Sequence, residues 1–123
     1  MLTSIDGKTY TELPHKNEYD RWMRNIKATD YQRVEDELNR IIDEKVAAGE
    51  PVTTGWIVPT IFDGTPFIAL YEACNKCETH TGLFLGLIVF DIMMHRPEQW
   101  YFGRFTYNGK EISSMTYFLE GKE

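Results

Sequence analysis

The stretch that decides the fold is THTGLFLGLIVFDIMMHRPEQW, residues 79–100. It contains the most hydrophobic segment of the chain, residues 82–94, in which Asp91 is the one residue that is not apolar. A helix that spans a bilayer needs about 20 apolar residues, so this shorter run predicts a helix buried in a protein core. The helix is expected to cover residues 79–95, because a residue that precedes a proline, here Pro97, is disfavoured in helical geometry.

Two glycines, Gly82 and Gly86, lie one turn apart in this expected helix. Glycine in the interior of a helix costs up to about 1 kcal/mol relative to alanine. That cost suggests that another surface packs closely against this face of the helix: a second helix, the sheet, a ligand or a second subunit. Self-association through Gly82 and Gly86, or through a C-terminal hairpin, is therefore expected.

The composition indicates one globular domain that comprises residues 1–123, with 42% hydrophobic and 26% charged residues. The formal net charge is −6, and acidic residues outnumber basic ones in both halves of the chain. Binding to nucleic acid is disfavoured, because neutralising phosphates requires a basic surface. Residues 1–3 do not begin a signal peptide, and the two cysteines suggest free thiols in a reducing compartment, so a cytoplasmic location is expected.

The N-terminal residues predict a hairpin followed by a short helix. Asp6-Gly7 is a signal for a type I′ hairpin turn within residues 4–10. Asn17 is expected to cap a helix over about residues 18–27. The apolar positions of this helix recur at intervals of three and four residues, which predicts one buried face made of Tyr19, Trp22, Met23 and Ile26.

A longer helix is expected over about residues 30–48. Thr29 and Gln32 have the spacing of a capping box at its start, and Gly49 is expected to end it. The buried face of this helix is predicted to consist of Tyr31, Val34, Leu38, Ile41 and Ile42.

The segment that follows is expected to be a linker over residues 51–62, with a strand-like centre at residues 56–58. After a turn at Asp63-Gly64, Thr65 as the cap and Pro66 as the first helical residue predict a helix over about residues 66–75. This helix and the central one should form an αα-hairpin.

The C-terminal residues 100–119 give the clearest β signal, a hairpin around a type I′ turn at Asn108-Gly109. A two-residue turn at that point predicts the cross-strand pairs Phe105–Ile112, Phe102–Met115 and Trp100–Tyr117. Both faces of the hairpin would then be partly apolar, and Gly103 is expected to mark a bulge. The elements together predict an α+β fold, with three to four helices packed on a small antiparallel sheet that includes this hairpin.

Cys74, Cys77 and His80 have the spacing of a partial metal site. Structural zinc usually has four thiolate or imidazole ligands, and the sequence offers no further ligand pair at a suitable spacing. A redox-active CxxC pair is disfavoured as well, because Cys74 lies near the C-terminus of its expected helix, where the helix dipole opposes a thiolate. Two small, buried or half-buried thiols are the simplest interpretation, and a structural zinc-binding domain remains an alternative.

Asp91 and His95 are four residues apart on the central helix, so their side chains can meet, and Arg104 could approach from the chain beyond. A carboxylate that orients an imidazole is the arrangement of a general base. The alternative is a purely structural pair, since a carboxylate in an apolar helix needs a partner. We expect the structural pair and treat Asp91, His95 and Arg104 as weak candidates for chemistry.

The chain contains 7 Phe, 7 Tyr and 3 Trp, a surplus of aromatic residues. Aromatic side chains are enriched at binding surfaces, and several of them could line a groove above Asp91. The alternative is that they pack in the core. The residues considered for such a ligand or partner surface are Trp56, Tyr71, Trp100, Tyr101 and Tyr117.

The sequence contains no motif that identifies a reaction, and we expect no catalytic residue, metal or cofactor. The first hypothesis is a small acidic intracellular module that binds another protein, regulates or inhibits it, and forms a homo-oligomer. The size and acidity are typical of an accessory protein of bacterial or phage type. The alternatives are a small-ligand-binding protein or enzyme that uses Asp91, His95 and Arg104, and the zinc-binding domain. No binding to nucleic acid or to a membrane is expected.

Overall fold

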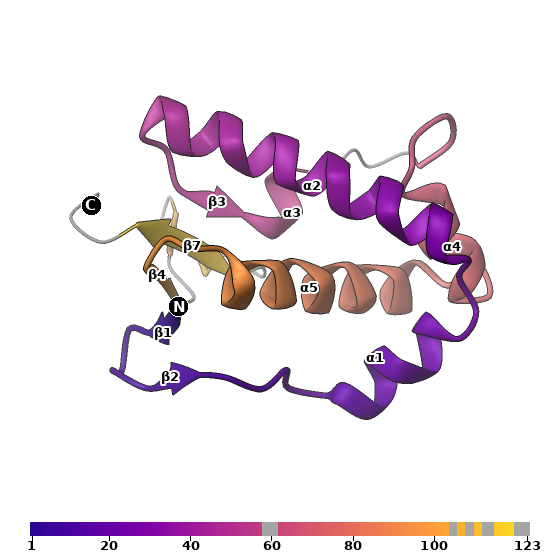
Figure 1. Ribbon diagram of the computed structural model, residues 1–123, viewed down its shortest axis with the longest axis horizontal. Helices are drawn as coiled ribbons and strands as arrows, with labels where there is room; N and C mark the ends of the chain where they lie inside the picture. Colours follow the sequence, from indigo (N-terminus) through magenta and orange to yellow (C-terminus); the bar gives the residue numbers. More distant parts are fainter. Residues whose placement is uncertain (58–61, 104–105, 108–109, 112–114, 120–123) are drawn as a thin grey trace.

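A computed structural model describes residues 1–57, 62–103, 106–107, 110–111 and 115–119. The fold is α+β, as expected: helices pack against a five-stranded, mostly antiparallel sheet with the strand order β2-β1-β4-β7-β3. Figure 1 shows α5 through the middle of the molecule, with α2 along one side and α1 and the β1–β2 hairpin on the other. The sheet lies at the C-terminal end of α5.

The strands are short. Three of the four strand pairings are antiparallel, and β1 pairs in parallel with β4, so that the N-terminal strand lies inside the sheet. β5 and β6 form a separate pair. The strands are β1 (Leu2–Ser4), β2 (Thr9–Tyr10), β3 (Val52–Thr53), β4 (Trp100–Gly103), β5 (Thr106–Tyr107), β6 (Lys110–Glu111) and β7 (Thr116–Leu119).

The turn of the N-terminal hairpin differs from the prediction. The amide of Ser4 donates to the carbonyl of Lys8 at 2.8 Å, and the amide of Gly7 donates to the carbonyl of Ser4 at 2.9 Å. Gly7 has a φ of 91°, whereas Asp6 does not have a positive φ. A type I′ turn needs positive φ at both central residues, so that prediction is wrong. The loop has three residues and uses Gly7 as its left-handed position.

The C-terminal hairpin has two registers. Tyr107 pairs with Lys110, as the sequence predicts for the turn. Farther from the turn, Phe102 pairs with Tyr117 and not with Met115, a shift of two residues. A shift of two leaves every side chain on its expected face, because side chains alternate with a period of two. Trp100, Phe102 and Tyr117 are accordingly all buried in the core. The predicted pair Phe105–Ile112 lies outside the described residues.

The prediction of a bulge at Gly103 is wrong, because Gly103 pairs regularly with Thr116. A glycine is needed at this position for a different reason. A Cβ atom added at Gly103 would lie 2.8 Å from Cδ1 of Ile5, which packs across this position. Only a residue without a side chain leaves room for Ile5 in its present conformation.

The first two helices, α1 (Lys16–Met23) and α2 (Ala28–Ala48), begin before their predicted starts. The residues before them are His15 and Lys27, and neither helix has a side-chain cap, so Asn17 and Thr29 do not cap them. The predicted end of α2 is confirmed, since Gly49 adopts the left-handed conformation with a φ of 70°. The predicted apolar faces of both helices are confirmed too, since both contribute to the core. The buried residues are Trp22, Val34, Leu38 and Ile42, and the partly buried ones are Tyr19, Met23, Ile26, Tyr31 and Ile41.

The segment after α2 contains the strand β3 and the short helix α3 (Thr54–Ile57). The strand predicted at 56–58 is therefore wrong for residues 56 and 57, and Val58 lies outside the described residues. The next helix, α4 (Ile68–Ala73), is shorter than predicted. Thr65 precedes it, and its hydroxyl donates to the carbonyl of Phe62 at 2.6 Å, a contact that fixes the turn before the helix.

The central helix α5 (Glu78–His95) matches its prediction to within one residue. It ends where expected, since Arg96 has extended backbone with a ψ of 150°. Helices α1 to α4 all contact it, and it supplies the largest share of the core: Thr81, Phe84, Leu85, Ile88, Val89, Phe90, Ile92 and Met93 are buried. Among the described residues, no helix combines the length and hydropathy that crossing a membrane requires.

Candidate functional site

One face of α5 is apolar and is only partly covered by the described residues of the chain. It consists of residues at the helical spacing i, i+3, i+4, i+7 and i+8, and we call it the open face: Thr79, Gly82, Leu83, Gly86 and Leu87. Leu83 is 56% exposed, one of three large apolar side chains exposed in the part of the chain that the structure describes. Gly82 is exposed as well, and Gly86 and Leu87 are half-buried.

The two glycines of the open face have no close neighbour in the described structure. A Cβ atom added at Gly82 or Gly86 would meet no heavy atom within 4 Å outside the helix's own backbone. The expectation that the sheet or another helix of this chain packs closely here is therefore not met by the described residues. Alanine would fit at both positions, so packing within the chain does not explain the choice of glycine.

The open face has defined borders. Towards the C-terminus of α5 it ends at Phe90, whose ring packs edge-on against Tyr10 and Phe102 at centroid distances of 5.5 and 5.2 Å. Beside the N-terminal half of α5, α1 covers the neighbouring strip through Tyr19 and Trp22, whose rings lie 5.9 and 5.6 Å from Phe84. The uncovered part therefore comprises about two helical turns.

Asp91 and His95 meet, as the sequence predicts. Nδ1 of His95 lies 3.5 Å from the carboxylate of Asp91 and 2.8 Å from the backbone carbonyl of the same residue. The His95 side chain is 74% exposed, and its ring closes the last turn of the helix. This geometry fits a helix-end contact better than a general base held in a cavity. Arg104 lies outside the described residues.

A pair of phenols that sequence reasoning missed lies near Asp91. The hydroxyls of Tyr19 and Tyr31 are 3.0 Å apart and join α1 to α2. Burial raises the pKa of both phenols, and the carboxylates of Asp91 and Glu35 raise them further. Both hydroxyls are therefore neutral at physiological pH, and one donates to the other. Both tyrosines belong to the predicted apolar faces, so the sequence offered no signal that their polar ends would meet.

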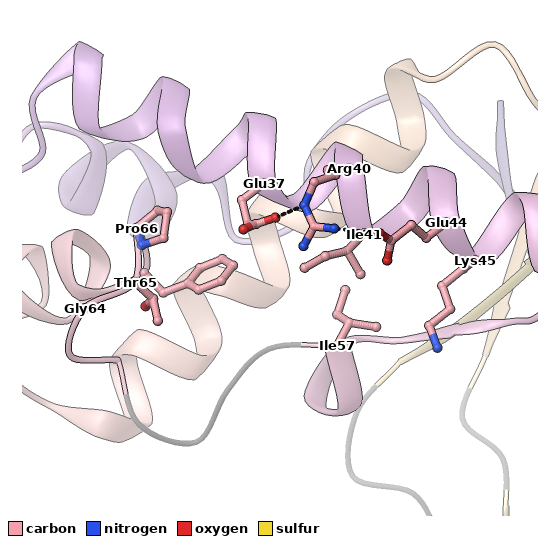
Figure 2. Close-up of a pocket in the computed structure, with 10 residues that line it drawn as sticks. Glu37, Arg40, Ile41, Glu44, Lys45, Ile57, Gly64, Thr65 and Pro66 are labelled. Atoms are coloured by element: carbon pink, nitrogen blue, oxygen red, sulfur yellow. Dashed lines mark hydrogen bonds and ion pairs between the residues drawn. The ribbon is translucent and has the colours of Figure 1, made fainter.

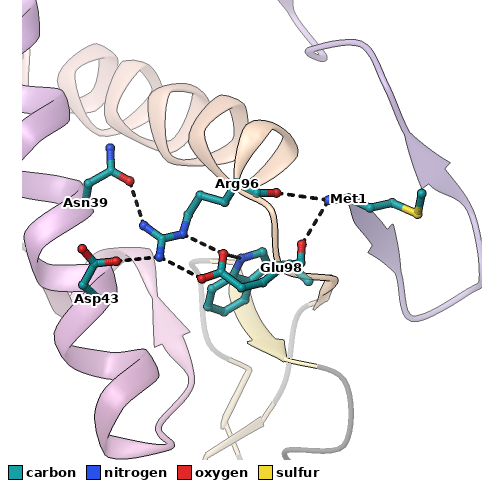
Figure 3. Close-up of polar contacts among 6 residues, drawn as sticks. Met1, Asn39, Asp43, Arg96 and Glu98 are labelled. Carbon is teal, nitrogen blue, oxygen red and sulfur yellow. Dashed lines mark hydrogen bonds and ion pairs between the residues drawn. The ribbon is translucent and has the colours of Figure 1, made fainter.

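The most extensive polar cluster surrounds Arg96, whose side chain is 12% exposed (Figure 3). Its guanidinium donates to Oδ1 of Asn39 at 2.8 Å and to Oδ1 of Asp43 at 2.6 Å, both on α2. It also donates to both carboxylate oxygens of Glu98 at 3.0 Å. Because its donors are taken up by these partners, Arg96 ties α2 to the chain between α5 and β4 and has a structural role.

Two further groups complete this cluster. Nε1 of the buried Trp100 donates to the Glu98 carboxylate at 3.2 Å. The amine of Met1 donates to the backbone carbonyls of Arg96 and Glu98 at 3.4 and 3.1 Å (Figure 3). The hydrogen bond from Arg96 lowers the pKa of Glu98, and partial burial opposes this effect. Sequence reasoning placed Arg96 at the end of the helix and considered it as a group near Asp91 and His95, and it missed this cluster because Asn39 and Asp43 lie far away in the chain.

The predicted aromatic surface is not assembled. Trp100 and Tyr117 are 0% and 1% exposed, so both belong to the core and cannot contact a ligand or partner. Tyr101 lies next to Trp100 on β4 and therefore on the opposite face of the sheet. Tyr71 lies on α4, and Trp56 lies on α3. The interpretation of aromatic residues as core packing is confirmed for the first two.

The residues predicted as zinc ligands do not form a metal site. Cys74 is buried at the end of α4, Cys77 is half-buried before α5, and His80 is exposed beside the ring of Trp22 at 5.6 Å. Within the described part of the chain, no three His, Cys, Asp or Glu side chains are grouped so that they could hold a metal ion.

A groove of about 470 Å³ lies between α2 and the segment before α4 (Figure 2). Its charged residues form ion pairs: Arg40 pairs with Glu37 and Glu44 inside the groove, and Lys45 pairs with Glu50 outside it. These ion pairs leave the groove less suited to a charged ligand than its composition suggests. The residues that line it are Glu37, Arg40, Ile41, Glu44, Lys45, Ile57, Gly64, Thr65, Pro66 and Phe67.

Comparison of the chain with models of protein families, with curated proteins and with solved structures gave no match.

Proposed function

We propose that the protein is a non-enzymatic interaction module that binds another protein through the open face of α5, and that it regulates or inhibits this partner. One observation carries the proposal: an apolar helix leaves Gly82, Leu83 and Gly86 uncovered, although the same helix forms the centre of the core. Exposed apolar residues that cluster on one face are typical of interaction sites.

The energetics of the open face favour a partner. Each glycine lowers helix stability by roughly 0.5–1 kcal/mol relative to alanine, and the described structure shows no contact that alanine would disturb. Small residues on a helix let a second backbone approach closely, which would explain Gly82 and Gly86. Burial of an exposed leucine side chain contributes about 1.5–3 kcal/mol, so Leu83 supplies an apolar anchor beside the glycines.

The partner surface that suits this face is an apolar helix. A second copy of the chain offers one, because a two-fold axis places the same face opposite itself, and we propose self-association through α5 as part of the function. We also propose a reducing, cytoplasmic location, which is supported by the two free cysteines.

The proposal is tested with Leu83→Glu, which places a charge in the open face, and with Ala47→Glu as the matched control. Ala47 is exposed on α2, so its replacement changes the net charge equally but away from α5. The wild type and Ala47→Glu are expected to self-associate in sedimentation velocity and to retain the same proteins in pull-downs, whereas Leu83→Glu is expected to lose both. A monomeric wild type whose pull-down equals that of Leu83→Glu would disprove the proposal.

A second candidate, binding of a small ligand beside Asp91 and His95, is supported by the 3.5 Å contact between these side chains. An NMR titration of His95 in the wild type and in Asp91→Asn distinguishes the two candidates. A site of this kind requires the titration midpoint to move markedly with the substitution. If the midpoint is unchanged, the second candidate is wrong and the pair is only a contact at the end of the helix.

A further inference from the structure

The turn between α4 and α5, residues 74–77, carries the two cysteines of the chain at its two ends. After Cys74, the amides of Asn75 and Lys76 donate back to carbonyls in the last turn of α4. The amide of Cys77 then donates to the carbonyl of Cys74 at 3.2 Å. Asn75 and Lys76 have φ angles of 56° and 59°, a left-handed conformation that is uncommon for residues other than glycine.

This geometry fixes the distance between the cysteines. A β-turn brings the Cα atoms of its first and fourth residues to within about 7 Å, and the hydrogen bond from Cys77 to Cys74 closes such a turn. Disulfides bridge Cα atoms that are roughly 4.4–6.8 Å apart. The backbone of the turn therefore holds the Cα atoms of Cys74 and Cys77 near the separation that a disulfide bond requires.

The two thiols differ in their surroundings. Cys74 is 2% exposed, and burial raises the pKa of its thiol, with a hydrogen bond involving Thr81 acting in the opposite direction. Cys77 is half-buried and directly precedes α5, whose first amides have no side-chain cap. Sequence reasoning disfavoured a redox pair because Cys74 lies at a helix C-terminus. That placement is right, but Cys77 lies at the N-terminus of an 18-residue helix, which favours a negative charge.

We propose that Cys74 and Cys77 form a reversible thiol–disulfide exchange site that reacts with small-molecule disulfides. The thiolate of Cys77 attacks a sulfur of the small disulfide, which forms a mixed disulfide at Cys77 and releases one small thiolate. Cys74 then gives its proton to that thiolate and attacks the sulfur of Cys77. This step forms the Cys74–Cys77 bond and releases the second small thiolate, which takes from water the proton that Cys77 gave up on ionising.

The reaction balances without any further reactant. The two cysteines are oxidised and lose two hydrogens, and the small disulfide is reduced to two thiols. The order of attack follows from exposure, because a disulfide in solution reaches the half-buried Cys77 and not the buried Cys74. Cys74 becomes reactive only after a mixed disulfide has formed next to it. The product links the end of α4 to the start of α5 and leaves the turn in place.

The test uses the reduced full-length chain in buffers of increasing glutathione disulfide content, followed by alkylation and mass spectrometry. The wild type is expected to lose two hydrogens and to show a peptide in which Cys74 and Cys77 are linked. Cys74→Ser is expected to accumulate one glutathione on Cys77. Cys77→Ser is expected to react at least about tenfold more slowly, because a buried thiol is inert.

Three results would overturn the proposal: stable glutathione adducts on the wild type, no reaction even in glutathione disulfide alone, or equal rates for the two serine variants. Circular dichroism verifies that both variants are folded before the rates are compared. Lys76→Gly serves as a matched control of the turn, because glycine adopts the left-handed conformation without strain. It is expected to form the disulfide as the wild type does, and failure to do so would count against the role of the turn.

Discussion

At the scale of single residues, glycine occupies its positions in this chain for three different physical reasons. Gly49 has a φ of 70° and ends α2 in a conformation that other residues adopt only with strain. Gly103 leaves room for the side chain of Ile5. Neither reason applies to Gly82 and Gly86 within the described structure. For this reason we propose that they contact a surface outside the chain.

The first prediction contrasts these glycines. Gly82→Ala and Gly86→Ala are each expected to raise the free energy of unfolding of the monomer by roughly 0.5–1 kcal/mol, because alanine loses less conformational freedom in a helix. The same substitutions should weaken self-association, because the added methyl groups keep a second helix away. Urea unfolding at low protein concentration measures the first effect, and sedimentation velocity measures the second.

Gly49→Ala is the control for this prediction, since the same change in side chain meets a positive φ. It is expected to lower the free energy of unfolding by about 1 kcal/mol and to leave self-association unchanged. Glycine substitutions that destabilise the protein equally at all three positions would show that Gly82 and Gly86 have an intramolecular role.

At the scale of elements, a close contact between Ile5 and Gly103 lies at the end of the pairing of β1 with β4. An added Cβ atom at Gly103 would lie 2.8, 3.1 and 3.2 Å from three carbon atoms of the Ile5 side chain. The side chain must therefore move as a whole to admit even a methyl group. Ile5 directly follows β1, and its amide donates to the carbonyl of Phe102 at 3.0 Å, so its backbone is held at this position.

The second prediction follows from this contact. Gly103→Ala is expected to destabilise the fold by about 1 kcal/mol, because overpacking forces neighbouring side chains from their preferred conformations. The effect should disappear when Ile5 is shortened to alanine, so the two substitutions are expected to be non-additive. Urea unfolding of the two single variants and the double variant measures the coupling. Full additivity would contradict the role assigned to Ile5.

The elements also show what the sequence could predict. The buried helix α5 could be placed within one residue, because thirteen nearly uninterrupted apolar positions and a following Pro97 leave no competing structure. The helix starts near Asn17 and Thr29 could not be predicted from these candidate caps. A cap contributes only about 1 kcal/mol, and tertiary packing can move the start of a helix by a few residues. The strand β3 was missed because it depends on pairing with β7, more than 60 residues later.

The candidate site was only partly predictable. The spacing of Gly82 and Gly86 drew attention to this face of α5, but the sequence could not show that no described residue of this chain packs closely against it. The exposure of Leu83 could not be predicted, because the sequence of an apolar helix does not indicate which side faces solvent. The register of the C-terminal hairpin was correct at Tyr107 and Lys110 and wrong by two residues farther away, where no local signal marks extra residues in the returning strand.

At the scale of the whole molecule, the Arg96 cluster is the polar link between the helical part and the sheet. It joins α2, through Asn39 and Asp43, to the segment that leads from α5 into β4. Glu98 holds the other side of the guanidinium, and the same carboxylate accepts from Trp100 in the core. Loss of the charge on Glu98 would therefore weaken a contact that connects three elements.

The third prediction concerns acid stability. Because the pKa of Glu98 is lowered in the folded state, its ionised form stabilises the fold above the ordinary glutamate pKa of 4.5. This contribution is lost as the pH falls below 4.5 and through the lower folded-state value. Glu98→Gln is expected to be less stable than the wild type near pH 7 and to lose less stability between pH 7 and strongly acidic conditions. Urea unfolding over a pH series measures both differences.

Glu12→Gln is the matched control, because Glu12 is exposed and has no ion pair among the described residues. Its stability is expected to follow that of the wild type across the whole pH series. A parallel pH profile for Glu98→Gln and the wild type would show that the contact with Arg96 contributes nothing to acid stability.

The parallel pairing of β1 with β4 sets the order in which the protein can fold during its synthesis. Leu2 lies beside Trp100, so the first strand meets its parallel neighbour only after that neighbour, nearly 100 residues later, has left the ribosome. Until then β1 can pair only with β2 in its local hairpin. Closing so long a loop carries an entropic penalty before any contact repays it, so we expect this parallel pairing to form more slowly than the local hairpin.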